Sequence, residues 1–125
     1  MTESVQAHRK DEHLSLGVKL WRQQENNPIG ATFADVRWLP ATFPEMAVAE
    51  ADVHTTLFNH TFDWPFYIEA MTGGSNLTGR INGQLASVAQ KTGLAMAVGS
   101  QSVALKYPEL ADTFKIVRET NPQGL

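Results

Sequence analysis

The sequence predicts an α/β fold built on a parallel β-sheet. Two stretches, residues 65–71 and 94–98, are almost continuously apolar, and each ends in a small polar turn. Strands that are apolar along their whole length are typical of parallel sheets covered on both faces. The stretch between them has the apolar spacing of a helix. Because two parallel strands joined by a helix form a right-handed crossover unit, we expect residues 64–121 to form a strand–helix–strand–helix unit.

The composition fits one ordinary globular domain and excludes several classes of function. The chain has 125 residues, of which 42% are hydrophobic and 18% charged, and its net charge of -3 gives no basic surface for nucleic acid. The absence of cysteine excludes a disulfide framework, a thiolate metal site and a cysteine nucleophile. The longest apolar run, 94–98, is far shorter than the roughly 18 residues of a membrane span, and the charged N-terminal stretch is no secretory signal. We therefore expect a cytoplasmic protein without nucleic-acid or membrane partners.

Residues 1–63 precede the parallel unit and have a different character. Residues 1–30 are polar with loosely spaced apolar positions, which indicates a short helix or an arm. Two short β-prone runs follow, residues 36–39 and 53–58, and each is bounded by a strand-breaking residue. They predict extended segments outside the main repeat. The chain therefore divides into an N-terminal arm with extended segments, 1–63, and the first βα units of a sheet, 64–125.

The first predicted helix follows the first strand. Ser75 is suited to the N-cap position and Gly93 to the C-terminal stop. One side of the helix carries its apolar residues, and this side is predicted to be buried. These residues are Leu77, Ile81, Leu85, Val88 and Ala89.

The second predicted helix begins at Pro108, since proline is favoured at the first helical position, and it ends at Asn121 and Pro122. Two strands are too few for a finished parallel sheet, which needs cover on both faces. The chain ends at Leu125, where a third strand would begin, and this ending is interpreted as a truncation. The residue pattern alone leaves a doubly wound sheet and a barrel open.

Candidate ligand-binding residues follow the two predicted strands, because ligands of parallel sheets lie at the carboxyl ends of the strands. Residues 72–75 combine a hydroxyl, two glycines and a helix N-terminus, so their backbone N–H groups could face an anion or a planar cofactor. Residues 99–102 offer hydroxyl and amide groups. On turn chemistry alone, a tight turn that requires glycine is the favoured alternative. Neither turn matches a dinucleotide or phosphate-loop fingerprint.

A third candidate is the charged stretch at residues 8–13. The adjacent cations Arg9 and Lys10 could bind a phosphate group while the neighbouring carboxylates restrain their side chains. The spacing of the histidines does not fit a metal motif. A solvated charged surface is the alternative interpretation, and it is the commoner one for such runs.

The order of these stretches resembles the type II isopentenyl-diphosphate isomerases. The resemblance rests on four motifs that occur in the same order along the chain. They are Arg9-Lys10-Asp11-Glu12-His13, Met71-Thr72-Gly73-Gly74, Ile81-Asn82 and Gly99-Ser100-Gln101. The resemblance implies a (β/α)8 TIM barrel, of which this chain would be the N-terminal part and incomplete as it stands. It also implies an isomerase of isoprenoid biosynthesis that interconverts isopentenyl diphosphate and dimethylallyl diphosphate.

The resemblance implies cofactors and site residues as well. The flavin is FMN, reduced by NADPH, and Mg2+ bridges to the substrate diphosphate; a homo-oligomer is expected. FMN would contact Ala70, Met71, Thr72 and Ser100. The diphosphate substrate would contact Arg9, Lys10, His13, Ser100, Gln101 and Ser102, the last standing where many relatives have arginine. No catalytic residue and no metal ligand is assigned in this chain, because the Mg2+-reaching pair of the family would lie beyond Leu125.

The resemblance therefore predicts that this chain alone is inactive. Two other functions stay open. The first is another FMN-dependent TIM-barrel oxidoreductase of small acids, which would not need the arm carrying Arg9 and Lys10. The second is a non-catalytic fragment that self-associates through its exposed sheet edge.

Overall fold

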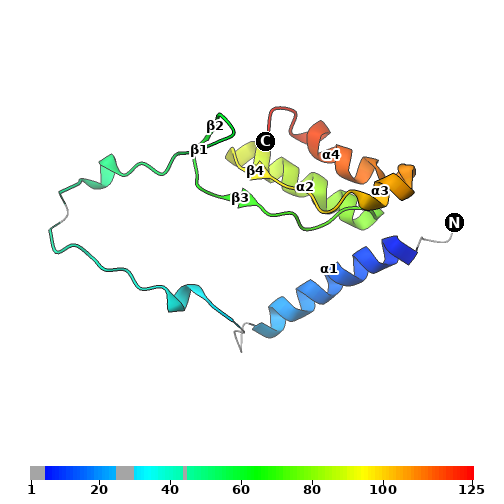
Figure 1. The fold of residues 1–125 in the computed structure, drawn as a ribbon, viewed down its shortest axis with the longest axis horizontal. Coiled ribbons are helices and arrows are strands. Elements are labelled where there is room, and N and C mark those ends of the chain that lie inside the picture. The colour runs from blue at the N-terminus through cyan, green and yellow to red at the C-terminus, as the bar shows by residue number, and fades with distance from the viewer. Residues whose placement is uncertain (1–4, 25–29, 44) are drawn as a thin grey trace.

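The computed structural model describes residues 5–24, 30–43 and 45–125 and shows two regions of different character (Figure 1). One region packs helices on a small parallel sheet, and the other is a long connecting segment that begins after the first helix. The helices are α1 (Val5–Gln24), α2 (Asn76–Thr92), α3 (Ser102–Lys106) and α4 (Asp112–Thr120), with 3-10 turns η1 (Phe33–Asp35), η2 (Val48–Glu50) and η3 (Pro108–Leu110). The strands are β1 (Thr55–Leu57), β2 (His60–Phe62), β3 (Tyr67–Ile68) and β4 (Ala95–Met96).

The parallel unit predicted from the sequence is confirmed. β3 pairs with β4 in parallel, with Tyr67 opposite Ala95 and Ile68 opposite Met96, and α2 connects them. On the other edge of β4, the Met96 N–H donates to the carbonyl oxygen of Leu125 at 2.9 Å. Residue 125 therefore lies where the predicted third strand would pair.

The strands are shorter and more open than predicted. β3 covers two residues of the expected 65–71, and the Tyr67 side chain is 58% exposed. Burial on both faces was thus the wrong prediction for β3. The physical reason is cover: among the described residues α2 packs against β4, whereas no helix makes comparable contacts with β3.

The ends of α2 lie where the sequence places them. The Ser75 hydroxyl accepts from the Thr78 N–H at 3.1 Å, and the Thr78 hydroxyl oxygen accepts from the Ser75 N–H at 2.9 Å, which completes a capping box. Gly93 ends the helix in the left-handed region, with φ of 68°. Both predicted boundaries are confirmed.

The buried side of α2 differs from the predicted one. The predicted apolar stripe is half-buried, and Val88 is 48% exposed. Of the predicted residues only Ala89 is fully buried, and the other buried residues of the helix are small or polar: Thr78, Gly79, Asn82 and Ala86. A Cβ built on Gly79 would lie 3.1 Å from the Thr113 Cβ in α4. The small side therefore lets α4 approach α2 closely, and this packing decides which side is buried.

The C-terminal part is helical, as predicted, but begins earlier. Pro108 opens η3, and α4 follows with Phe114 buried. Residues 102–106 form α3, an unpredicted helix that begins at the last residue of the turn expected at 99–102. None of the described helices is long and apolar enough to cross a membrane.

The connecting segment contains one small hairpin. β1 and β2 pair antiparallel through a two-residue turn, in which Phe58 and Asn59 both have positive φ, as in a type I′ turn. The β-prone run at 36–39 forms no strand, and Trp38 is 89% exposed. Of the two runs predicted to be extended, only 53–58 contains a strand, because a second segment pairs with it there.

Candidate functional site

The turns after β3 and β4 meet at one edge of the sheet, as the parallel arrangement predicts. The Gly99 N–H donates to the Thr72 carbonyl oxygen at 3.0 Å. A Cβ built on Gly99 would lie 2.9 Å from that same oxygen, so the close approach requires glycine. The candidate residues around 72 and 100 thus belong to one place in the fold.

The buried side chain of Asn82 holds the turn after β3 in place. Its side chain is 1% exposed, and its amide nitrogen donates to the carbonyl oxygens of Thr72, at 3.2 Å, and of Thr113, at 3.0 Å. The Thr113 hydroxyl accepts from the Gly74 N–H at 2.9 Å and donates to the Leu110 carbonyl at 2.6 Å. Among the described residues no buried side-chain polar atom lacks a partner. The turn after β3 is therefore tied to α2 and α4 by a complete polar network.

The two glycines of this turn serve packing rather than ligand approach. Gly73 has φ of 148°, and a Cβ there would lie 2.1 Å from the Phe114 ring. Gly74 has φ of 98°, and a Cβ there would lie 2.5 Å from Val103. Since the Gly74 N–H already donates to Thr113, it does not face an anion. The tight-turn interpretation is the one the structure supports at these two positions.

Helix α1 docks on the N-terminal end of α2. The Asp11 carboxylate accepts a hydrogen bond from the Ser75 hydroxyl, and Ala7, one turn earlier, is 4% exposed. Glu12 pairs with His8 at 3.3 Å. The carboxylates of the charged stretch thus bond to Ser75 and His8, and do not restrain Arg9 and Lys10 as the sequence suggested.

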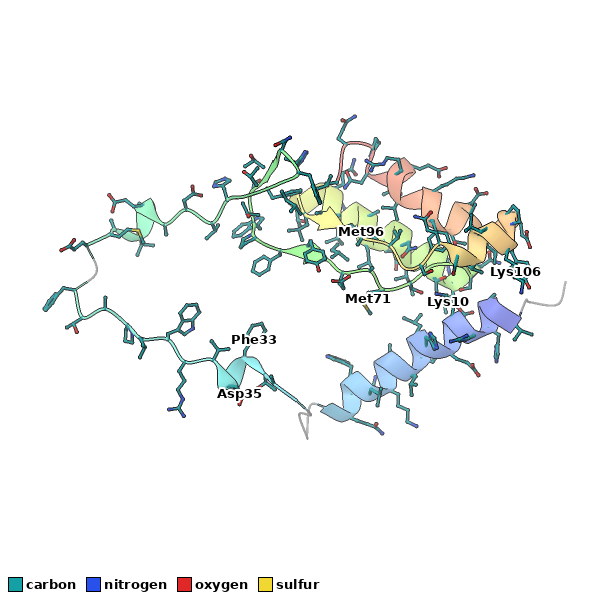
Figure 2. The ribbon with its side chains drawn as sticks, viewed as in Figure 1. Lys10, Phe33, Asp35, Met71, Met96 and Lys106 are labelled. Carbon is teal, nitrogen blue, oxygen red and sulfur yellow. The ribbon has the colours of Figure 1, made fainter. Side chains whose placement is uncertain are left out.

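This docking forms a groove between α1 and the turn after β3. Lys10 and His13 line it from α1, and Met71 and Thr72 line it from the turn. Figure 2 labels Lys10 and Met71, one from each side of the groove. Its volume is about 380 Å³, within the range in which proteins hold small organic ligands. The remaining lining residues, all on α1, are Leu14, Gly17, Val18 and Trp21. Two predicted substrate residues and two predicted cofactor residues therefore share one groove.

The other predicted site residues lie outside the lining of this groove and are exposed. They are Arg9, Ala70, Ser100, Gln101 and Ser102. The Ser100 hydroxyl donates to the Ser102 hydroxyl at 3.0 Å. Ser100 follows Gly99 directly and Ser102 lies two residues further on, so both are close in sequence to the Gly99–Thr72 contact.

Glu69 is the ionised group beside the predicted cofactor residues. The Tyr67 hydroxyl donates to its carboxylate, and the Ala70 N–H donates to the same group at 2.7 Å. The Tyr67 hydrogen bond and then the Ala70 N–H lower the pKa of Glu69, and the same Tyr67–Glu69 bond raises the pKa of Tyr67. Sequence reasoning missed Thr113 as a site residue, and it missed the contact of Asp11 with Ser75, because both depend on segments that are distant in the chain.

No protein-family model matches the chain. Curated relatives do match it over almost its whole length, and each is named isopentenyl-diphosphate delta-isomerase. The relative from Lactococcus lactis subsp. lactis is 48% identical over 98% of this chain and 35% of its own length. The one from Latilactobacillus sakei subsp. sakei is 48% identical over 98% of this chain and 34% of its own. The relative from Lacticaseibacillus casei is 46% identical over 99% of this chain and 35% of its own length. The chain thus spans about a third of the length of the relatives it matches.

Proposed function

We propose that this chain, a relative of isopentenyl-diphosphate delta-isomerases over 98% of its length, supplies the substrate-binding arm and the cofactor-facing strand ends of such an enzyme. The observation that carries the proposal is the shared groove. It brings Lys10 and His13 of α1 opposite Met71 and Thr72 at the end of the first parallel strand. A substrate held by the cations would therefore lie against the residues expected to contact the cofactor.

The chemistry of the groove supports a diphosphate substrate with a short apolar tail. The Lys10 ammonium is a compact point charge suited to phosphate oxygens, and Arg9 lies next to it on the same helix. His13 lies almost one helical turn further along and also lines the groove. Apolar side chains, Leu14 and Met71 among them, form the walls beyond these groups. The head of the substrate would lie at the cations and its hydrocarbon part along the apolar wall.

The residues present also fit FMN of the type II enzymes. The apolar lining of the groove suits a planar ring system and includes Met71, and Ala70, the residue before it, is exposed. Reduced FMN, with NADPH as the source of electrons, supplies the acid–base chemistry that moves the double bond when it is bound. This chain's part is to orient the substrate and to present a rigid strand end, which Asn82 and Gly99 hold in place.

We assign no Mg2+ ligand in this chain. Among the described residues, no three or more histidine, aspartate or glutamate side chains come together to hold a metal ion by themselves. The parallel β3–α2–β4 unit, with residue 125 beginning to pair along β4, supports our proposal that these are the first units of a (β/α)8 barrel.

The test is to place residues 1–125 where they match in the Lactococcus lactis relative and to measure isomerisation of isopentenyl diphosphate with FMN, NADPH and Mg2+. Lys10→Ala should lower kcat/KM roughly tenfold to a hundredfold, since it removes a charge-assisted contact to the diphosphate. Lys19→Ala, on the same helix but outside the groove, is the matched control and should change it less than twofold. Equal effects of the two substitutions would remove the support for the groove. Residues 1–125 alone should show no turnover.

A further inference from the structure

A hydrogen bond between Asp11 and Ser75 links α1 to the parallel unit, and it involves neither Arg9 nor Lys10. Asp11 lies on α1 between Lys10 and His13, and its carboxylate accepts from the Ser75 hydroxyl at 2.5 Å. Ser75 is 1% exposed and is the N-cap of α2. We propose that Asp11 is a positioning residue, which fixes α1 so that Lys10 and His13 face Met71 and Thr72. The inference rests on the proposed function for its meaning, but its geometry can be tested separately.

The contact has chemistry suited to a fixed attachment. A serine hydroxyl has one donor and can accept as well, and here it accepts from the Thr78 N–H while it donates to Asp11. The carboxylate lies at the N-terminus of a helix of 17 residues, where the helix dipole favours negative charge. Two effects, a charge-assisted hydrogen bond and the dipole, therefore act on the same oxygen.

The position of Asp11 along α1 explains why it sets the direction of the Lys10 and His13 side chains. Ala7 precedes Asp11 by four residues, lies on the same side of the helix, and is buried. Together they attach the first half of α1, whereas residues 15–23 are exposed. Successive helix positions differ by about 100° of rotation, so holding Asp11 against Ser75 sets where Lys10 and His13 point.

Glu12 is the natural control for this inference. It is the neighbouring carboxylate and pairs with His8 on the same helix, where both side chains are more than half exposed. Such an exposed pair within one helix does not attach α1 to anything else. Removing Glu12 changes the net charge as much as removing Asp11, but leaves the contact to α2 intact.

The experiment uses the absence of cysteine to measure the groove directly. Gly17→Cys and Met71→Cys place spin labels on its two walls, and pulsed electron resonance measures the distance between them. The parent chain should give one narrow distance distribution. Asp11→Ala should at least double its width, Glu12→Ala should leave it unchanged, and Asp11→Asn should keep it narrow, because the amide oxygen still accepts from Ser75. Circular dichroism, which reports total helix content, should show no loss in any variant larger than α1 alone could account for.

Three outcomes separate the inference from the proposed function. A distribution that stays narrow in Asp11→Ala, or is already broad in the parent chain, overturns the positioning role. In the grafted enzyme, Asp11→Ala should raise KM for isopentenyl diphosphate at least fivefold with kcat changed less than twofold, and Asp11→Asn should restore KM. If Asp11→Ala broadens the distance distribution but Lys10→Ala leaves kcat/KM unchanged, the positioning role of Asp11 stands and the proposed function is overturned.

Discussion

Side-chain burial differs between two regions of the molecule, the packed region from Thr72 to Asn121 and the connecting segment after α1. In the packed region the most deeply buried side chains are small or polar, such as Thr78 at 0% and Asn82 at 1% exposure. In the connecting segment large apolar side chains are open, with Phe33 at 96% and Leu39 at 98%. Figure 1 shows why: α4 lies along α2, whereas the connecting segment runs away from both. Burial follows from an available partner surface and satisfied hydrogen bonds, not from side-chain hydrophobicity alone.

The largest expected effect is the difference in free energy of unfolding between two alanine variants, one at a buried position of the packed region and one at an exposed position of the connecting segment. Asn82→Ala removes both donors from the carbonyls of Thr72 and Thr113 and leaves a cavity, so we expect a loss of about 2–4 kcal/mol in the free energy of unfolding. Trp38→Ala deletes a far larger side chain that is 89% exposed and should change it by less than about 0.5 kcal/mol. Urea denaturation followed by circular dichroism measures both.

The control for this comparison is Gln84→Ala, an exposed position on the same helix as Asn82. It should be neutral or slightly stabilising, because alanine favours helix more than glutamine does. A Trp38→Ala loss as large as that of Asn82→Ala would show that the connecting segment packs in solution. The contrast between the two regions would then be wrong.

A smaller effect is expected from adding the same side chain to two helical glycines. In Gly79→Leu the new Cβ alone would lie 3.1 Å from the Thr113 Cβ in α4, closer than ordinary van der Waals contact, so the substitution should cost about 1–3 kcal/mol through overpacking. Gly17→Leu meets nothing within 4 Å and should be neutral or stabilising by about 0.5–1 kcal/mol, since leucine favours helix more than glycine. Thermal unfolding of the two variants compares them. A stability change of the same sign in both variants would contradict the close approach of α2 and α4.

Sequence reasoning predicted the parts of this molecule that depend on local chemistry. Ser75 and Gly93 end α2 because their roles need only their own side chain or backbone. The parallel order of β3 and β4 followed from strand–helix–strand connectivity. The fully buried residues of α2 were predicted correctly only at Ala89, because Asn82 and Gly79 are buried by a helix that starts thirty residues later in the sequence.

The candidate site shows the same division. Motif order placed Lys10, His13, Met71 and Thr72 on the list of site residues, and the structure brings these four together. The attachment that aligns them, Asp11 to Ser75, joins residues 64 apart in the chain and has no local signature. A pattern indicates which residues are suited to a ligand, whereas contacts between segments decide which of them meet.

The smallest predicted effect lies in the connecting segment, at the base of its hairpin. His54 Nδ1 lies 2.5 Å from Asp52 Oδ1, and the His54 Nε2 lies 3.6 Å from Asp63. The hydrogen bond with Asp52 raises the pKa of His54 above its ordinary 6.5. The His54 backbone N–H, and then its ring, lower the pKa of Asp52 below its ordinary 3.8. The pair is fully charged in the window between these two ordinary values.

The sign of the pH effect follows from these directions. The His54 contribution is complete below pH 6.5 and is lost as the pH rises through the raised pKa, and the Asp52 contribution is complete above pH 3.8 and is lost as the pH falls through the lowered pKa. Asp52→Asn should lower the pKa of His54 clearly, and Asp63→Asn should lower it less, since Asp63 is the more distant carboxylate. Nuclear magnetic resonance titration of the His54 ring measures both shifts. Equal shifts would mean that the hairpin base is not ordered as in this structure, whereas the predicted ranking would show that even the exposed region has one defined contact.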